Sequence, residues 1–134
     1  MTKIKKPTSN KGANIQQPEV RYNNIDYPIF CFKHLHKDYS LSKCEDSEKK
    51  NFVSQLVLLS SHTWNDIQLA PKHGLGSEKI NLSSIKASLP VSFTEEVKHL
   101  LAFRFDGKKA FVGFRSGFIF HIFYLDRDFT LYQH

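Results

Sequence analysis

Hydrophobic and polar residues alternate along the last third of the chain, a pattern typical of β-strands. Two dipeptides that end in glycine interrupt the alternation, and such dipeptides favour two-residue hairpin turns. We therefore expect a meander of strands joined by tight turns, with a last strand that runs to the final residue. The strands are expected at residues 100–105, 109–115, 118–125 and 129–134, and the turns at Asp106-Gly107 and Ser116-Gly117.

The middle of the chain, residues 41–62, has hydrophobic residues at helical spacing. Thr63 and Asp66 have the spacing of a capping box, which predicts a second short helix that ends at Pro71. The positions expected to face the core are Phe52, Val53, Leu56, Val57 and either Leu59 or Ser60, and those expected to face solvent are Glu48, Lys49 and Lys50.

A β-rich run after Pro28 predicts one more strand, over residues 29–36. The pattern as a whole predicts an α+β fold. It consists of an antiparallel sheet of about four strands, the N-terminal strand and the C-terminal meander, with two or three helices packed on one face. Residues 1–27 are polar and lack periodicity, so they are predicted to be a disordered basic tail. Residues 28–134 are predicted to form a single domain.

The expected turns also fix which side chains share a face of the sheet, because side chains alternate along a strand. Tyr132 and His134 point the same way in the last strand, and His121 falls on the apolar face of the sheet. The polar face is expected to hold Arg104, Lys109, Arg115 and Tyr124, and the apolar face Leu101, Phe103, Phe105, Val112, Phe114, Ile119 and Phe123.

Composition narrows the class of protein. The formal net charge is +6, and residues 1–25 carry a net +4 of it, which favours a polyanionic partner such as RNA or DNA. The longest apolar run is shorter than the roughly 18 residues that a membrane span needs, and no secretory signal is recognisable. Cys31 and Cys44 lack the spacing of a metal site. We expect a cytoplasmic protein with reduced thiols and no membrane contact.

The predicted polar face is the first candidate for chemistry, because its residue types suit a phosphodiester. Arginine binds phosphate through two hydrogen bonds, histidine can move the proton of a 2′-hydroxyl, and tyrosine can stack on a base. The alternative is an ordinary solvated sheet face. The residues expected to contact RNA without reacting are Lys72, Lys108, Lys109 and Tyr124.

The loop "HGLGSEKI" is the second candidate, because His73, Glu78 and Lys79 lie close together beside two glycines. The alternative is a plain connection that happens to contain three polar residues. His34 and His36 would share a face of the first strand, as two metal ligands do, but no neighbouring ligand completes a metal site. We therefore expect no metal.

The order of strand, helices, loop and meander, ending in "LYQH", resembles the RelE/ParE superfamily of bacterial toxins. The motifs that carry the resemblance are Arg115 before the second hairpin, the following "HIFYLD", and the aromatic and histidine residues at the end. YoeB-like members end in His-Tyr, whereas this chain ends in Tyr132-Gln133-His134.

The resemblance implies a toxin of a type II toxin–antitoxin system that cleaves mRNA, on the ribosome, without a metal or small-molecule cofactor. A cognate antitoxin protein would be its partner. By the same resemblance, Glu78 or His134 would be the general base. His73 and His121 are further catalytic candidates on the chemistry of their imidazoles alone. Arg104 and Arg115 would stabilise the phosphate, Lys79 would assist, and Tyr132 would hold the substrate.

Two other functions fit the same pattern. A binding module would grip RNA or a protein without cutting, and an isolated arginine pair without a nearby base would favour it. A ParE-like toxin would act on DNA gyrase and needs no catalytic base. For that toxin we expect Glu78, Lys79 and His134 to lie apart in space.

Overall fold

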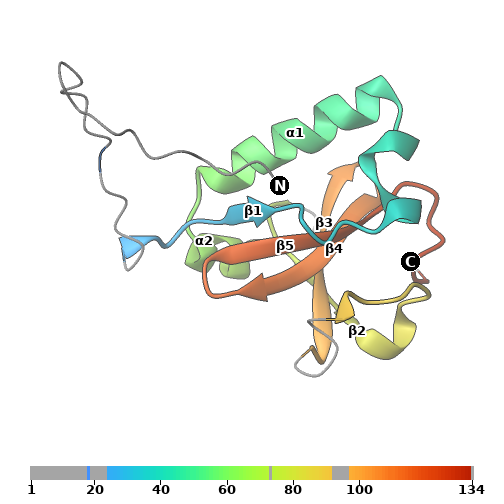
Figure 1. Ribbon diagram of the computed structural model, residues 1–134. Coiled ribbons are helices and arrows are strands. Elements are labelled where there is room, and N and C mark those ends of the chain that lie inside the picture. Colours follow the sequence, from blue (N-terminus) through green and yellow to red (C-terminus); the bar gives the residue numbers. More distant parts are fainter. Residues whose placement is uncertain (1–17, 19–23, 73, 92–96, 134) are drawn as a thin grey trace, which may run out of the picture.

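The computed structural model describes residues 18, 24–72, 74–91 and 97–133 of the chain. It contains one five-stranded sheet in the order β1-β5-β4-β3-β2 (Figure 1). Strand β1 runs parallel to β5, and the other neighbours are antiparallel. The strands are β1 (Ile29–Cys31), β2 (Glu78–Asn81), β3 (His99–Asp106), β4 (Lys109–Ser116) and β5 (Ile119–Asp126).

Two α-helices lie between β1 and β2. They are α1 (Asp46–Ser60) and α2 (Trp64–Leu69), and short 3-10 turns occur at η2 (Lys37–Tyr39), η3 (Leu41–Lys43) and η4 (Leu82–Ser84). The α+β class and the helix positions are confirmed, but the sheet is mixed and gains β2, which the alternation pattern missed. No helix in the described part of the chain is long and apolar enough to span a membrane.

Both helices begin with a capping box. The predicted pair in α2 is present, because Thr63 Oγ1 accepts a hydrogen bond from Asp66 N–H at 3.1 Å. In α1 the N-cap residue is Glu45, and Glu48 Oε1 accepts its N–H at 2.7 Å. These bonds satisfy backbone donors that the first helical turn leaves unpaired.

Glu48 is buried, which contradicts the prediction that it faces solvent. Its side chain is 1% exposed and forms ion pairs with Lys109 Nζ at 2.7 Å and Arg127 Nε at 2.9 Å. The hydrogen bond from Lys109 and the backbone N–H of Glu45 hold the pKa of this carboxyl at about 2, well below its ordinary value. Glu48 therefore ties the first turn of α1 to β4 and to the end of β5.

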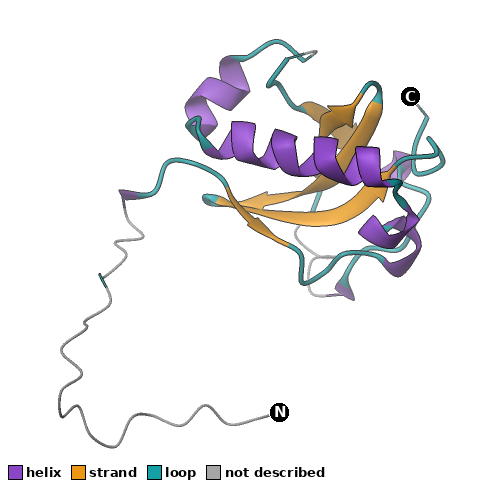
Figure 2. Cartoon of the chain, turned by 90° about the horizontal axis from the view of Figure 1, so that it is seen from above, coloured by secondary structure: helices purple, strands orange, loops and turns teal. Residues whose placement is uncertain are grey.

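The helices cover one face of the sheet with an aromatic core, and Figure 2 shows α1 crossing above the strands. Phe52 of α1 contacts the ring of Phe111 at 5.2 Å between centroids, and Phe103 contacts Phe120 at the same separation. The T-shaped geometry of both pairs is the one that aromatic rings prefer. Within α1, the predicted core positions Phe52 and Leu59 are buried, but Val53 and Val57 are exposed.

The opposite face of the sheet is also covered, so it is not the open polar face that the sequence predicted. Residues 82–89 and the C-terminal segment pack there around Tyr124, which is fully buried. Lys86 N–H donates to the carbonyl of Leu131 at 2.8 Å, which joins the two covering segments. The sheet is therefore buried between two hydrophobic clusters.

The last segment is not a strand, contrary to expectation. Asp126 accepts hydrogen bonds from the N–H groups of Thr130 and Leu131, at 3.0 and 3.2 Å, and folds the chain back over the sheet. Phe129 has a positive φ of 58°, which no β-strand residue adopts. The first strand is also shorter than predicted, because residues 32–36 leave the sheet.

Two register shifts explain why part of the predicted face assignment was wrong, although Leu101, Phe103 and Phe105 do pack on the face that the helices cover. Both turns begin one residue later than expected, with Gly107 and Gly117 at positive φ of 58° and 62°. Further irregularities occur between Arg104 and Asp106 and between Val112 and Gly113. A shift of one residue moves a whole strand's side chains to the other face. Val112, Phe114 and Phe123 accordingly join the cluster opposite the helices.

We expect replacement of Glu48 by glutamine to lower the free energy of unfolding by on the order of 3 kcal/mol, because two cations would lose their buried partner. The folded pKa of about 2 lies below the ordinary value of 4.5, so this carboxylate stabilises the fold above about pH 5. Its contribution is lost as the pH falls towards 2. Urea unfolding at pH 7 and pH 3 measures both effects.

The matched control is Asp46→Asn, because Asp46 is fully exposed in the same helical turn. We expect Asp46→Asn to behave like the wild type, and Glu48→Gln to lose less stability than the wild type between pH 7 and pH 3. A Glu48→Gln protein within about 0.5 kcal/mol of the wild type at pH 7 would refute the role of this cluster.

Candidate nucleic-acid interface

A groove of about 620 Å³ lies where α2 meets the ends of β2, β3 and β4. Its lining contains lysine, arginine and histidine side chains, and no carboxylate among the described residues. We call it the basic groove, and it is lined by Trp64, Gln68, Ser77, Lys79, Lys98, His99, Leu101, Phe114 and Arg115. Cationic, partly aromatic grooves suit anionic ligands such as a phosphate backbone.

Arg115 is fixed in this groove by two contacts. Its guanidinium stacks over the ring of Trp64, with the central carbon 4.2 Å from the ring centroid, and its Nε–H donates to Gly117 O at 2.8 Å. Within the described residues it forms no ion pair, and burial lowers its pKa without any acid to counter the shift. Arg115 is therefore a positioned cation whose two terminal nitrogens are available for an anion.

Trp64 is held just as firmly. It is 4% exposed, its indole N–H donates to the carbonyl of Phe118 at 2.9 Å, and it packs against Phe103 and Phe120. Its ring is therefore a support for Arg115 and not a free platform for a base.

The strand register brings the other cations to the groove. Lys79 pairs with Leu101, and Asn81 pairs with His99, so Lys79, Leu101 and His99 share the helix-side face of the sheet. The turn before β2 is tight: Gly76 N–H donates to Pro71 O at 2.9 Å, and a Cβ on Gly76 would overlap the backbone of Ala70 and Pro71. Glycine at this position therefore sets where Ser77 and Lys79 lie.

The predicted catalytic residues are divided between the two faces of the sheet. Arg115 and Lys79 lie in the basic groove, whereas Glu78, the neighbour of Lys79 on β2, points to the opposite face. There Glu78 forms an ion pair with Lys72 at 3.0 Å. The sheet thus separates Glu78, predicted to act as the base, from Arg115, predicted to stabilise the phosphate.

Arg104 and Tyr132 lie on the same side of the sheet as Glu78, opposite the basic groove. Burial raises the pKa of Tyr132 to about 12, with smaller contributions from the charges of Glu78 and Asp126 and an opposing one from Arg104. Tyr132 is 4% exposed and is part of the hydrophobic cluster there. It is a core residue of the C-terminal segment, and its phenol stays protonated at neutral pH.

The remaining predicted residues have structural roles or lie elsewhere. Burial, followed by the charge of His34, lowers the pKa of His121, whose ring centroid lies 6.2 Å from that of His34. Tyr124 donates its hydroxyl to Ser88 O at 2.7 Å, and burial raises its pKa to about 12. Lys109 belongs to the Glu48 cluster.

The last three predicted site residues are Lys108, His73 and His134. Lys108 is exposed in the first hairpin turn. His73 and His134 lie outside the described residues. No group of three histidine, cysteine or acidic side chains that could hold a metal ion occurs in the part of the chain that the structure describes.

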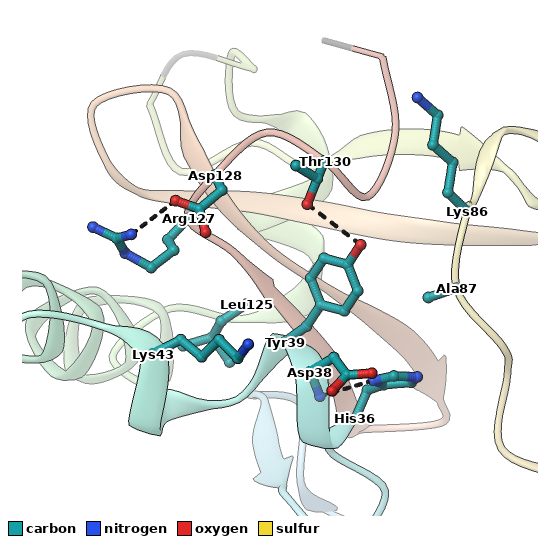
Figure 3. Close-up of a pocket in the computed structure, with 10 residues that line it drawn as sticks. All are labelled: His36, Asp38, Tyr39, Lys43, Lys86, Ala87, Leu125, Arg127, Asp128 and Thr130. Atoms are coloured by element: carbon teal, nitrogen blue, oxygen red, sulfur yellow. Dashed lines mark hydrogen bonds and ion pairs between the residues drawn. The ribbon is translucent and has the colours of Figure 1, made fainter.

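A smaller pocket of about 370 Å³ is lined by residues of η2, η3, the end of β5 and the segments that follow β5 and η4 (Figure 3). It contains acids as well as bases, and Arg127 Nη1 donates to Asp128 Oδ1 at 2.8 Å. Tyr39 and Thr130 approach each other across it at 3.4 Å between their hydroxyl oxygens. Because its charges partly neutralise one another, this pocket is less suited to a polyanion than the basic groove.

Of the residues that line the groove, only Lys79 and Arg115 were predicted from the sequence as site residues, and Trp64, Lys98 and His99 are the basic or aromatic ones that were not. Trp64 was assigned only to the second helix, and Lys98 and His99 directly precede the strand expected at residues 100–105. Nothing in the local pattern shows that residues near 64, 79, 98 and 115 meet, because β2 was not predicted. The local signal that could have pointed to this groove was the basic pair "KH" at the start of a predicted strand.

We expect Tyr132→Ala to cost about 3 kcal/mol of folding free energy, because it removes a buried aromatic ring, and to leave ligand binding by the folded protein unchanged. Urea unfolding and a binding titration at low urea measure the two effects. If Tyr132→Ala kept full stability but lost binding or activity, Tyr132 would be a site residue as the sequence suggested.

Comparisons with protein-family models, with curated proteins and with solved structures found no match to this chain.

Proposed function

We propose that this protein binds single-stranded RNA along the basic groove. The observation that carries the proposal is the position of Arg115, which is held by Trp64 and Gly117 and forms no ion pair among the described residues. A fixed guanidinium without an acid partner is prepared to receive a phosphate with little loss of side-chain entropy.

The neighbouring side chains extend this site along a strand of nucleic acid. Lys79 and Lys98 are exposed cations in the same lining and can neutralise flanking phosphates. Ser77 and His99 offer hydrogen bonds of the kind that distinguish the 2′-hydroxyl of RNA from DNA. Leu101 and Phe114 add apolar surface for bases or sugars.

The wild-type protein is expected to bind a fluorescein-labelled uridine heptanucleotide, as measured by fluorescence anisotropy. Arg115→Ala should weaken binding about tenfold or more, because a hydrogen-bonded charge contact is lost. With about three phosphates neutralised, log K should fall against log salt with a slope of about −2. Lys79→Ala and Lys98→Ala should each make that slope shallower.

Two matched variants make this test specific. Lys50→Ala removes one exposed cation from α1, outside the groove, and should bind like the wild type. Arg115→Lys keeps the charge but loses both the two-hydrogen-bond geometry of the guanidinium and its stacking on Trp64. Its RNA affinity should lie between those of the wild type and Arg115→Ala. The proposal is contradicted if Arg115→Ala binds RNA as tightly as the wild type. It is also contradicted if Lys50→Ala loses as much RNA affinity as Arg115→Ala.

A second candidate function is RNA cleavage, which would make the protein a cytoplasmic toxin restrained by an antitoxin. His99 is the observation that favours it, because this imidazole lines the same groove as Arg115 and Lys79. The imidazole can take the proton of a 2′-hydroxyl while the cations stabilise charge on the phosphate. His99 replaces Glu78 as the base in this proposal, since Glu78 faces the other side of the sheet.

If the protein cleaves RNA, induced expression of the wild type should arrest growth and create new mRNA 5′ ends. His99→Ala should abolish the new ends and still bind the heptanucleotide, because it retains Arg115. Glu78→Ala should remain active. Normal growth and intact mRNA with the wild type would leave RNA binding as the function, and full activity of His99→Ala would exclude this base.

A further inference from the structure

A second pocket adjoins the basic groove at Arg115. It has a volume of about 720 Å³ and shares Trp64, Gln68 and Arg115 with the groove. It extends towards the segment before β1 and the start of α2, where Asp26 and Asn65 line it. We call it the Asp26 pocket.

Asp26 and Arg115 line the same pocket with opposite charges but do not form an ion pair, within the residues that the structure describes. Opposite charges that share a cavity without pairing can each bind a different part of one ligand. Such a ligand carries a negative group at the arginine and hydrogen-bond donors at the carboxylate.

The backbone fixes the position of Asp26. Its carbonyl accepts the N–H of Trp64 at 2.7 Å, so the residue is attached to the first turn of α2. Its side chain is exposed in the pocket and forms no hydrogen bond or ion pair with the other residues that the structure describes, while Asn65 and Gln68 present amides beside it from α2. The backbone hydrogen bond therefore joins Asp26 to the helix that carries the two amides.

We propose that the Asp26 pocket is a base subsite that selects guanine, next to the phosphate held by Arg115. Guanine presents N1–H and the N2 amino group side by side on its Watson–Crick edge, and a carboxylate accepts both at once. Adenine, cytosine and uracil do not offer two adjacent donors there. This inference rests on the proposed function and names the nucleotide that the site prefers.

The surrounding side chains fit a base. The Asn65 and Gln68 amides can donate to the O6 acceptor of guanine, which a carboxylate would repel. Phe118 supplies a partly exposed aromatic edge in the lining, and the positive φ of Gly117 turns the chain tightly beside Arg115. The pocket thus offers a hydrogen-bond acceptor, hydrogen-bond donors and apolar surface to a single planar base.

The test uses the full-length protein and four uridine heptanucleotides whose central nucleotide is G, A, C or U. The wild type should bind the G oligonucleotide at least about fivefold more tightly than the others, the lower end of discrimination by a bidentate base contact. Asp26→Asn should lose this preference and keep its affinity for the all-uridine oligonucleotide. Asp38→Asn, which changes an exposed carboxylate outside both sites, should keep the preference.

A second titration separates this inference from RNA binding itself. GMP and AMP differ in the base alone, and the quenching of Trp64, the one tryptophan in the sequence, reports their binding beside Arg115. RNA binding with equal affinity for all four oligonucleotides overturns the guanine subsite and leaves the proposed function standing. Preference for GMP over AMP without binding of any heptanucleotide overturns the proposed function and supports the subsite. A G preference that survives Asp26→Asn also overturns the inference.

Discussion

The buried carboxylate of Glu48 is the interaction on which the rest of the fold depends. It closes the capping box of α1 and receives Lys109 from β4 and Arg127 from the end of β5. One side chain thus joins the helix to two consecutive strands that lie far from it in the sequence, and its low pKa reflects these partners. With α1 fixed in this way, Phe52 and Leu59 reach the aromatic core, and the short helix that follows is placed where Trp64 can support Arg115.

Burial of both faces of the sheet decides where chemistry can occur. The helices cover one face, and residues 82–89 with the C-terminal segment cover the other, so no broad sheet surface is left for a ligand. Polar side chains that were expected on such a surface have become core or anchor residues, as Tyr124 and Tyr132 illustrate. The groove proposed to bind RNA lies at the rim of the sheet beside α2, where basic side chains of β2, β3 and β4 line it.

The sequence predicted what depends on local chemistry. The capping pair at Thr63, the helical periodicity of α1 and the existence of the meander were all recognisable, because each follows from neighbouring residues. The register was not, because a shift of one residue in either glycine turn, or one bulge, exchanges the faces of a strand. Glu48 was misplaced for a related reason: a charged residue in a first helical turn normally faces solvent, and its two cationic partners lie far along the chain. The groove at Arg115 depends on β2, a four-residue strand without a clear alternating pattern.

An NMR titration of the ¹⁵N-labelled protein with the uridine heptanucleotide shows most directly whether RNA binds in the basic groove. The chain has a single tryptophan, so its indole N–H resonance identifies Trp64 without further assignment. RNA binding in the basic groove should shift this resonance and the Nε–H resonance of Arg115 together, in proportion to the RNA added, while resonances from the pocket around Tyr39 and Arg127 stay unchanged. Shifts confined to that other pocket, or no shift of the Trp64 resonance at saturating RNA, would contradict it.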